Sequence, residues 1–325
     1  MKTRRSPRFP LEITILKQGT PSKKVLSASF FTMKDAYNDI HIYELSLKKF
    51  LKQKKQLKGF ETRIYTDDSG KEIVLKIVKE DPTVSIYHFN FKPLREEVGH
   101  IGIFGMIPRF LPLFEPGLEV VWVTDIDIPD YWIHPSILDT MKKESSLCSW
   151  LNSVCYEKPY KIYGRPYTIM AGTFVSFHTF PPQLFRTYLK QLQNGYYKKE
   201  IAELIRNNPT KSSSIVPYGI DELFMNYSIY DSLKQNNIKC MIRRGYGYTR
   251  KLLAKEHLLT KKEETLLQRY HITEDKRLFK NVIAIYKKYT PILIKSYPCI
   301  QSFIDKLDIL DNSLIELFFI NGKDL

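Results

Sequence analysis

Residues 118–127 are LEVVWVTDID, an apolar run that stops at two aspartates. An unbroken apolar run is typical of a central parallel strand that is covered on both faces. Ligands of open α/β sheets bind just beyond the carboxyl ends of the strands, so the aspartates fall where such a fold places its ligand. Side chains alternate along an extended backbone, and we therefore expect Asp125 and Asp127 to project to one side and Ile126 into the core.

Two carboxylates on one side make a hard oxygen site, which suits Mg²⁺ or Mn²⁺. Without a cation the two charges would repel each other and raise a pKa. A divalent ion removes that penalty and keeps coordination positions open for diphosphate oxygens. The sequence therefore predicts Mn²⁺ or Mg²⁺ at Asp125 and Asp127. A single Asp-x-Asp triplet is a weak signal, and the alternative is an exposed turn at the strand end.

Strand and helix patterns alternate before this run. Four strand-like segments separated by three helical ones predict a doubly wound α/β sheet. The expected strands are 25–31, 60–66, 84–89 and 118–124, with more strand at 167–177. Helices are expected at 182–193, at 221–234 and in several pieces from 252 to 319, including an apolar helix at Ser313–Phe319 that could pair two copies.

No repeat or linker divides the chain, so we expect one mixed domain. Residues 1–24 are basic and carry three prolines, which predicts a flexible arm. The main domain would cover 25–250, and 251–325 would form a helical extension packed on it. The basic residues 1–10 lack a following apolar segment, so we expect no secretory signal, and no apolar run nears 18 residues. These features predict a soluble cytoplasmic protein.

The composition narrows the function classes. The 325 residues are 43% hydrophobic, which excludes global disorder. Lys and Arg number 50 against 35 Asp and Glu, a net charge of +15 that suits an anionic partner or a solvated basic surface. The four cysteines form no CxxC pair, which argues against a zinc ribbon. A GxxxxGK phosphate loop is absent, which disfavours a P-loop NTPase.

Four segments in order resemble the nucleotide-sugar glycosyltransferases of the GT-A fold. The segment Arg109–Pro116 followed by VVWVTDID looks like the arginine-bearing helix and the strand that delivers the DxD motif. The other three are Arg63–Asp67, Ala171–Phe174 and Tyr218–Phe224. The resemblance covers residues 25–235. It implies a GT-A-like (Rossmann-like) mixed, mainly parallel sheet flanked by helices, with a nucleotide-binding half at 25–127 and an acceptor half at 128–250.

The resemblance also implies an activity, that of a metal-dependent glycosyltransferase of the hexosyltransferase type. The donor would be a UDP-linked sugar, and the acceptor a hydroxyl of a glycan or another molecule. Asp127 would ligate the metal, and Asp125 would ligate it or bind the ribose and sugar. Arg109 would reach the donor sugar or the first carboxylate. The remaining implied residues are Phe30 and Asp67 near the uracil, Gly172 beside the donor, and Asp221 and Glu222 facing the sugar or acceptor, with Asp221 as the base of an inverting reaction.

Other interpretations of these residues stay open. Arg109 could be a core-edge arginine, Asp221 a helix N-cap, Asp67 part of a turn, and Gly172 a bulge. The family's glutamine is Glu222 here, and no histidine stands in the late segment 240–246 to act as a third metal ligand. Arg243 and Arg244 could instead hold the diphosphate directly, and His257 is a weak substitute for the histidine.

Two other functions remain as alternatives. The first is a non-catalytic nucleic-acid-binding protein, although no nucleic-acid-binding pattern is present and we expect no such partner. The second is a sugar-nucleotidyltransferase, which would need a glycine-rich basic loop after the first strand. The segment that follows that strand, Thr32–Asp35, is not such a loop.

Overall fold

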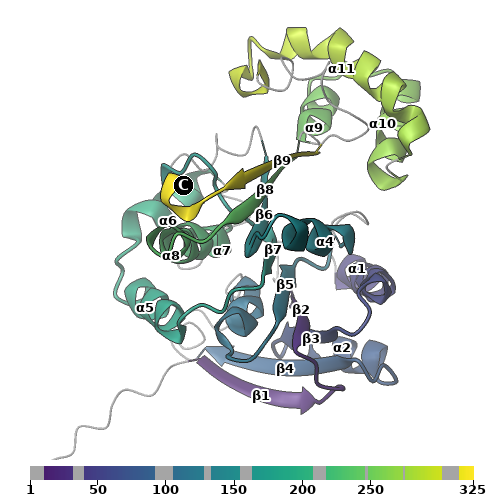
Figure 1. Ribbon diagram of the computed structural model, residues 1–325. Coiled ribbons are helices and arrows are strands. Elements are labelled where there is room, and N and C mark those ends of the chain that lie inside the picture. The colour runs from purple at the N-terminus through teal and green to yellow at the C-terminus, as the bar shows by residue number, and fades with distance from the viewer. Residues whose placement is uncertain are drawn as a thin grey trace, which may run out of the picture. The chain divides into compact units, whose positions relative to one another are not determined.

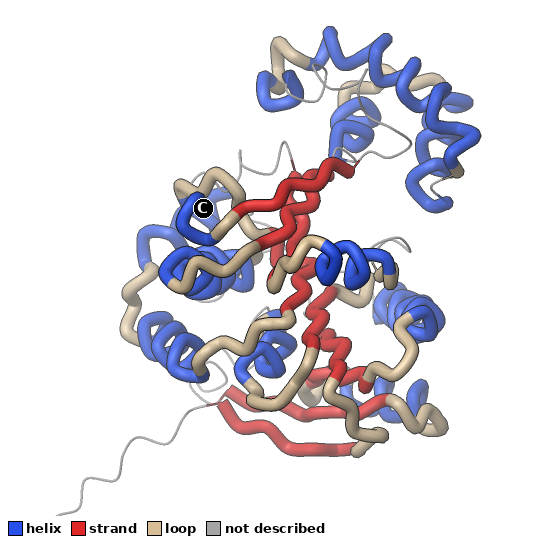
Figure 2. Tube along the Cα trace, in the orientation of Figure 1, coloured by secondary structure: helices blue, strands red, loops and turns tan. Residues whose placement is uncertain are grey.

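The computed structural model describes residues 11–31, 40–91, 105–127, 133–153, 163–207, 217–245, 248–273, 275–301 and 315–325. These ranges contain nine strands of a mixed sheet and ten α-helices (Figures 1 and 2), so the expected α/β class is confirmed. The chain divides into two compact units. The first comprises residues 1–127 and 175–232, and the second comprises 128–174 and 233–325.

The first unit is built on five strands in the order β1-β4-β3-β2-β5. Their bounds are β1 Leu11–Lys17, β2 Lys24–Phe30, β3 Glu61–Thr66, β4 Val84–Phe91 and β5 Val120–Thr124. Strands β2 to β5 pair in parallel, and β1 pairs antiparallel with β4. The chain builds outward from β2 to β4 and then returns to place β5 on the other side of β2. That reversal is the topological switch point at which doubly wound sheets bind ligands.

Strands β3 and β5 are covered on both faces, although β3 carries the charged residues Glu61 and Arg63. Every residue of β3 and β5 is buried, as parallel strands covered by helices require. Figure 1 shows α1 (Ile40–Gln53) and α2 (Lys71–Val78) on one side of these strands and α5 (Pro182–Gln193) on the other. The bounds of α5 agree with the predicted helix. The unit also contains the 3₁₀ segment η3 (Pro108–Phe114), α6 (Lys198–Asn207), α7 (Ile220–Phe224) and a π-helical turn at Met225–Ile229.

The predicted flexible arm over residues 1–24 is wrong where the structure describes it. Residues Leu11–Lys17 form the edge strand β1, which pairs with β4 from Leu11 opposite Phe91 to Lys17 opposite Ile86, with a register shift between Ile15 and Lys17. Leu11, Ile13 and Ile15 alternate with polar residues as in a strand, but five of the seven side chains are exposed, so burial does little to order the segment. Backbone pairing with β4 supplies the order instead. Residues 1–10 lie outside the described ranges.

The second unit contains the strands β6, β8 and β9, with β8 between the other two. It also contains most of a fourth strand, β7. Strand β6 (Cys148–Ser153) is parallel to β8 (Cys240–Gly245), and β8 is antiparallel to β9 (Ile315–Ile320). The fourth, β7 (Met170–Ser176), spans the division, because its last two residues belong to the first unit. It falls within the predicted strand region at 167–177. Helix α4 (Ser136–Lys143) belongs to this unit. Helix α8 (Tyr230–Gln235) begins in the first unit and ends in the second, because the boundary falls after residue 232.

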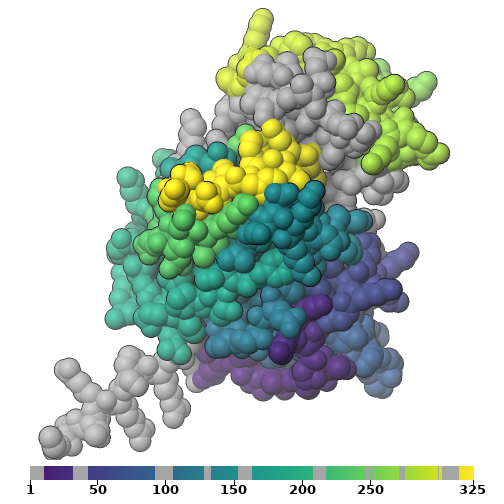
Figure 3. Space-filling model, in the orientation of Figure 1, coloured from purple at the N-terminus to yellow at the C-terminus, as the bar shows by residue number. Residues whose placement is uncertain are grey.

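The predicted C-terminal helix at Ser313–Phe319 is wrong over its described residues, because Ile315–Ile320 form β9. A short apolar run fits a helix or a strand equally well, and the hydrogen bonds to β8 decide in favour of a strand. Leu317 and Phe319 are 43% and 39% exposed, and Figure 3 shows this C-terminal segment in yellow on the surface. The expected pairing of two copies through a helix therefore loses its basis.

The described residues 248–301 are mainly helical, as predicted. They contain α9 (Tyr248–Lys255), α10 (Lys261–Thr273) and α11 (Phe279–Leu293), which share a core of their own that includes Leu253, Leu267 and Tyr286. Among the described helices, none has the length and apolar character that crossing a bilayer requires.

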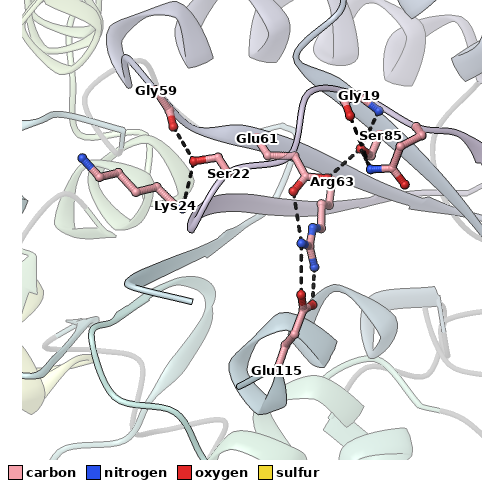
Figure 4. Close-up of polar contacts among 9 residues, drawn as sticks. Gly19, Ser22, Lys24, Gly59, Glu61, Arg63, Ser85 and Glu115 are labelled. Carbon is pink, nitrogen blue, oxygen red and sulfur yellow. Dashed lines mark hydrogen bonds and ion pairs between the residues drawn. The ribbon is translucent and has the colours of Figure 1, made fainter. Parts of the chain in front are cut away.

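A chain of polar contacts runs through the buried side of β3 (Figure 4). Arg63 forms an ion pair with Glu61 at 3.1 Å and a second one with Glu115, which follows η3. The Ser85 hydroxyl donates to the other oxygen of Glu61 at 2.6 Å and accepts from the Gly19 amide at 2.8 Å. Glu61 is 1% exposed, so its charge depends on these partners.

The Arg63 contacts give a first prediction. Arg63→Met leaves the buried Glu61 carboxylate without its cation, and we expect a loss of about 3–5 kcal/mol in the free energy of unfolding, measured by urea denaturation. The control is Lys48→Met, which removes a solvent-exposed ion pair with Glu44 at 2.6 Å and should change stability by less than about 1 kcal/mol. Equal effects of the two substitutions would show that the Arg63 contacts are energetically unimportant.

Candidate functional site

The switch point of the first unit brings together the carboxyl ends of β2 and β5. The two strands pair in parallel from Lys24 opposite Val120 to Ser27 opposite Val123, and β5 ends at Thr124. Beyond that end, Asp125 is half-buried, Ile126 is buried and Asp127 is exposed. This alternation is the one expected from the sequence, and it leaves both carboxylates at the edge where doubly wound sheets bind ligands.

Arg109 occupies the centre of the site. It is 3% exposed, and its guanidinium forms ion pairs with Asp125 and, at 2.7 Å, with Asp221. The Ser27 hydroxyl donates to the Arg109 carbonyl at 2.6 Å, which ties η3 to β2. The guanidinium also lies over the ring of Phe110, with 5.2 Å between its carbon and the ring centroid. Contacts to both the backbone carbonyl and the guanidinium therefore fix the position of Arg109.

The charges around Arg109 balance its burial. Burial lowers the pKa of the guanidinium, but the carboxylates of Asp125 and Asp221 outweigh burial and hold that pKa above its usual value. Glu222 raises it further. The guanidinium stays charged, so the cluster contains one fixed cation beside the carboxylate that follows β5. The alternative of a core-edge arginine with its head in water does not fit these contacts.

Aromatic packing fixes η3 against α7. The ring of Phe224 lies 5.6 Å from that of Phe110 and 6.1 Å from that of Phe114, and Phe185 of α5 contacts both Phe114 and Phe224. These rings are buried, and their close packing restricts how far η3 can move relative to α7. The distance between Arg109 and the start of α7 is thereby set by the apolar core.

Asp221 lies in the first turn of α7 and is not its N-cap. Gly219 holds the cap position with φ +93°, a left-handed conformation that glycine adopts readily. The Asp221 carboxylate accepts from Arg109 and, at 3.1 Å, from the Glu222 amide, and the residue is 3% exposed. Buried in this way, Asp221 is not open to an acceptor hydroxyl. The contacts favour a positioning residue for Arg109 over the predicted base. Glu222 is buried too, and its carbonyl accepts from the Asn226 amide.

Two other predicted residues of the first unit are buried in contacts of their own. Phe30 is fully buried at the end of β2, and a Cβ on Gly70 would come within 2.7 Å of its ring. Asp67, after β3, accepts from the Ser69 amide at 2.9 Å and forms the turn before α2. Phe30 is therefore a core residue and Asp67 a buried turn residue, and neither presents its side chain to a nucleobase in this arrangement. Gly172 belongs to the second unit and is half-buried within β7, so it does not mark a turn.

The donor set at the strand end fits a cation that is shared with a ligand. In the described ranges, no group of three or more His, Cys, Asp or Glu side chains is arranged to hold a metal ion. Asp125 and Asp127 supply two carboxylates, and one Asp125 oxygen accepts from Arg109. Mg²⁺ commonly uses one or two carboxylates together with substrate phosphates, so the pair fits such an ion but not a cage made by protein alone.

Sequence reasoning did not foresee the contact between Arg109 and Asp221, which are 112 positions apart. It also did not identify the hydrogen bond that Ser27 donates to the Arg109 carbonyl in η3. A charged residue inside the apolar segment PRFLPLF was the available signal, because a buried charge requires a partner of opposite sign. The sequence could not show which carboxylate would provide it.

The ion pair gives a second prediction. Arg109→Met leaves Asp221 buried and unpaired, so we expect a loss of about 3–5 kcal/mol in the free energy of unfolding. Asp221→Asn in that background removes the stranded charge. The double variant should then lose about 1–3 kcal/mol less unfolding free energy than the sum of the losses in the two single variants. A double-mutant cycle measured by urea denaturation gives this difference. Additive losses would mean that the two side chains do not interact.

The burial of Asp67 gives a third prediction. Burial raises the pKa of the Asp67 carboxyl, although hydrogen bonds from Ser69 act in the opposite direction. The folded protein thus keeps this proton to higher pH than the unfolded chain. Its contribution to stability is full below the ordinary value of 3.8 and is lost as pH rises through the raised pKa.

Asp67→Asn keeps an acceptor for Ser69 and carries no charge. Relative to the unsubstituted protein, the variant should therefore gain stability as pH rises from about 4 to about 7, and the two should converge near the lower limit. Urea denaturation across this range measures the difference. A difference in unfolding free energy between the two proteins that grows toward low pH would contradict the raised pKa of Asp67.

Comparison with known proteins identifies no family for this chain. No protein-family model matches the chain, and a search of curated proteins finds no match. Support for a function therefore comes from the chemistry of Arg109 and the carboxylates around it.

Proposed function

We propose that this protein is a metal-dependent glycosyltransferase that uses a nucleotide-sugar donor, a UDP-sugar in our proposal, and a hydroxyl acceptor. The observation that carries the proposal is the buried Arg109 held between Asp125 and Asp221 at the switch point. Beyond this edge, Asp127 adds an exposed carboxylate. A fixed cation beside two carboxylates is an arrangement that can receive a cation and a diphosphate together.

Glycosyl transfer from a nucleoside diphosphate builds negative charge on the leaving phosphate. When bound, a divalent ion supplies Lewis-acid stabilisation of that charge. In this proposal Asp127 and Asp125 would hold the ion. Arg109 orients Asp125 and contributes positive charge nearby without needing to reorganise, because Asp221 and the Phe110 ring already fix its guanidinium.

The acceptor proton has two possible destinations. An inverting reaction needs a carboxylate within hydrogen-bond reach of the acceptor hydroxyl. Asp221 is occupied by Arg109, so we assign it to positioning, and Glu222 beside it is buried as well, so neither meets this requirement in the present arrangement. In a retaining reaction the leaving phosphate oxygen itself can accept the proton, and neither side chain is then required as a base.

The proposal gives a fourth prediction. UDP should bind with a Kd that depends on Mn²⁺, and Asp127→Ala should weaken UDP binding in the presence of Mn²⁺ by about tenfold or more, measured by isothermal titration. Asp127 is exposed, so its removal should leave the fold intact. The matched control is Asp139→Ala, which removes an exposed carboxylate from the first turn of α4 and should leave UDP binding unchanged.

The results separate this proposal from its alternatives. UDP binding that ignores Mn²⁺, or that is equal in the two variants, would contradict it. Tight, salt-sensitive DNA binding with no response to UDP would favour a nucleic-acid-binding protein. Two assays distinguish a glycosyltransferase from a sugar-nucleotidyltransferase. Incubated with a panel of UDP-sugars, a glycosyltransferase releases UDP by slow hydrolysis. A sugar-nucleotidyltransferase instead releases pyrophosphate from UTP and a sugar phosphate.

A further inference from the structure

Three arginines in the described ranges are buried, and one of them differs from the others. Arg63 pairs with Glu61 and Glu115, and Arg109 pairs with Asp125 and Asp221. Arg243, in β8 of the second unit, is 4% exposed and forms no ion pair with any described residue.

The contacts of Arg243 are to neutral hydroxyl groups. Its Nε donates to Ser149 Oγ of β6 at 3.2 Å, and its Nη2 donates to Thr173 Oγ1 of β7 at 3.3 Å. All three residues belong to the second unit, and both hydroxyl-bearing residues are fully buried. Burial lowers the pKa of Arg243 to about 10, so the guanidinium still carries its charge at neutral pH.

An uncompensated buried charge is costly, and folded proteins pair such charges with a counter-charge. A guanidinium has five N–H groups, and the two contacts above use two of them. Ser149 and Thr173 accept from Arg243, and each hydroxyl keeps its own proton to donate. Arg243 therefore offers a positive charge and N–H groups beyond the two that these contacts use, while the described residues supply it no anion.

We propose that Arg243, Ser149 and Thr173 form a binding site for a phosphate group. Arginine recognises phosphate through parallel N–H donors, and a tetrahedral oxyanion has enough oxygens to meet the guanidinium and both hydroxyls. The phosphate is either free inorganic phosphate or the terminal group of a phosphorylated small molecule. This inference stands apart from the proposed glycosyl transfer, which uses residues of the first unit.

The test uses the full chain and follows Tm with added ligand. At matched ionic strength, orthophosphate should raise Tm by about 2 °C or more relative to chloride. Arg243→Met should abolish that increment. The matched control is Arg244→Met: Arg244 is the next residue of β8 and lies over Phe318, with 4.7 Å to the ring centroid. Its substitution should leave the phosphate increment in place.

Two further arms keep the proposal testable if Arg243→Met does not fold. Ser149→Ala and Thr173→Val remove the hydroxyl donors, and each should reduce the phosphate increment while Arg243 is retained. UMP in place of orthophosphate separates the sources when the unsubstituted protein is compared with Arg243→Met, because UMP also fits the proposed site of the first unit. A larger Arg243-dependent increment with UMP points to a phosphorylated small molecule, and a smaller one to free phosphate. No increment in the unsubstituted protein, or an equal increment in all variants, would overturn the proposal.

Discussion

The ion pairs of Arg109 are the constraint on which the sheet edge beyond β5 depends in the first unit. One buried guanidinium joins the segment after β5 to the first turn of α7, and its backbone carbonyl is held by Ser27 of β2. Removing a partner from a buried charge costs several kcal/mol, so these elements are coupled strongly. The position of Asp125 is therefore set by residues far from it in sequence before any ligand binds.

Such a preorganised cluster is what electrostatic catalysis requires. A fixed cation contributes most where the surrounding protein has already excluded water and the charge does not need to reorganise. Phe110, Phe114 and Phe224 provide that packing around Arg109. Asp125 and Asp127, in contrast, keep contact with solvent and can exchange ligands. The site thus combines a rigid buried part with an accessible edge, as the proposed binding of a metal ion and a diphosphate needs.

Comparison of the buried arginines extends this reasoning to the second unit. Arg63 and Arg109 each have two carboxylate partners, so their charges are balanced within the fold. Arg243 has hydroxyl partners alone among the described residues, and the missing negative charge is the basis for a phosphate site there. The same physical rule, that buried charge needs compensation, accounts for the stability of two clusters and for the binding capacity inferred for the third.

The sequence by itself determined the α/β class, the buried strand that ends at Asp125, and helix α5, because periodicity and burial leave clear local patterns. The tertiary structure alone decided the outcome wherever a segment is locally ambiguous or its partner is distant. An exposed segment became β1 through pairing with β4, and an apolar run became β9 through pairing with β8. The contact of Arg109 with Asp221 joins residues 112 positions apart, and the side chain of Phe30 is buried because Gly70 allows close approach. Such long-range contacts are set by how the whole chain packs, which local spacing does not encode.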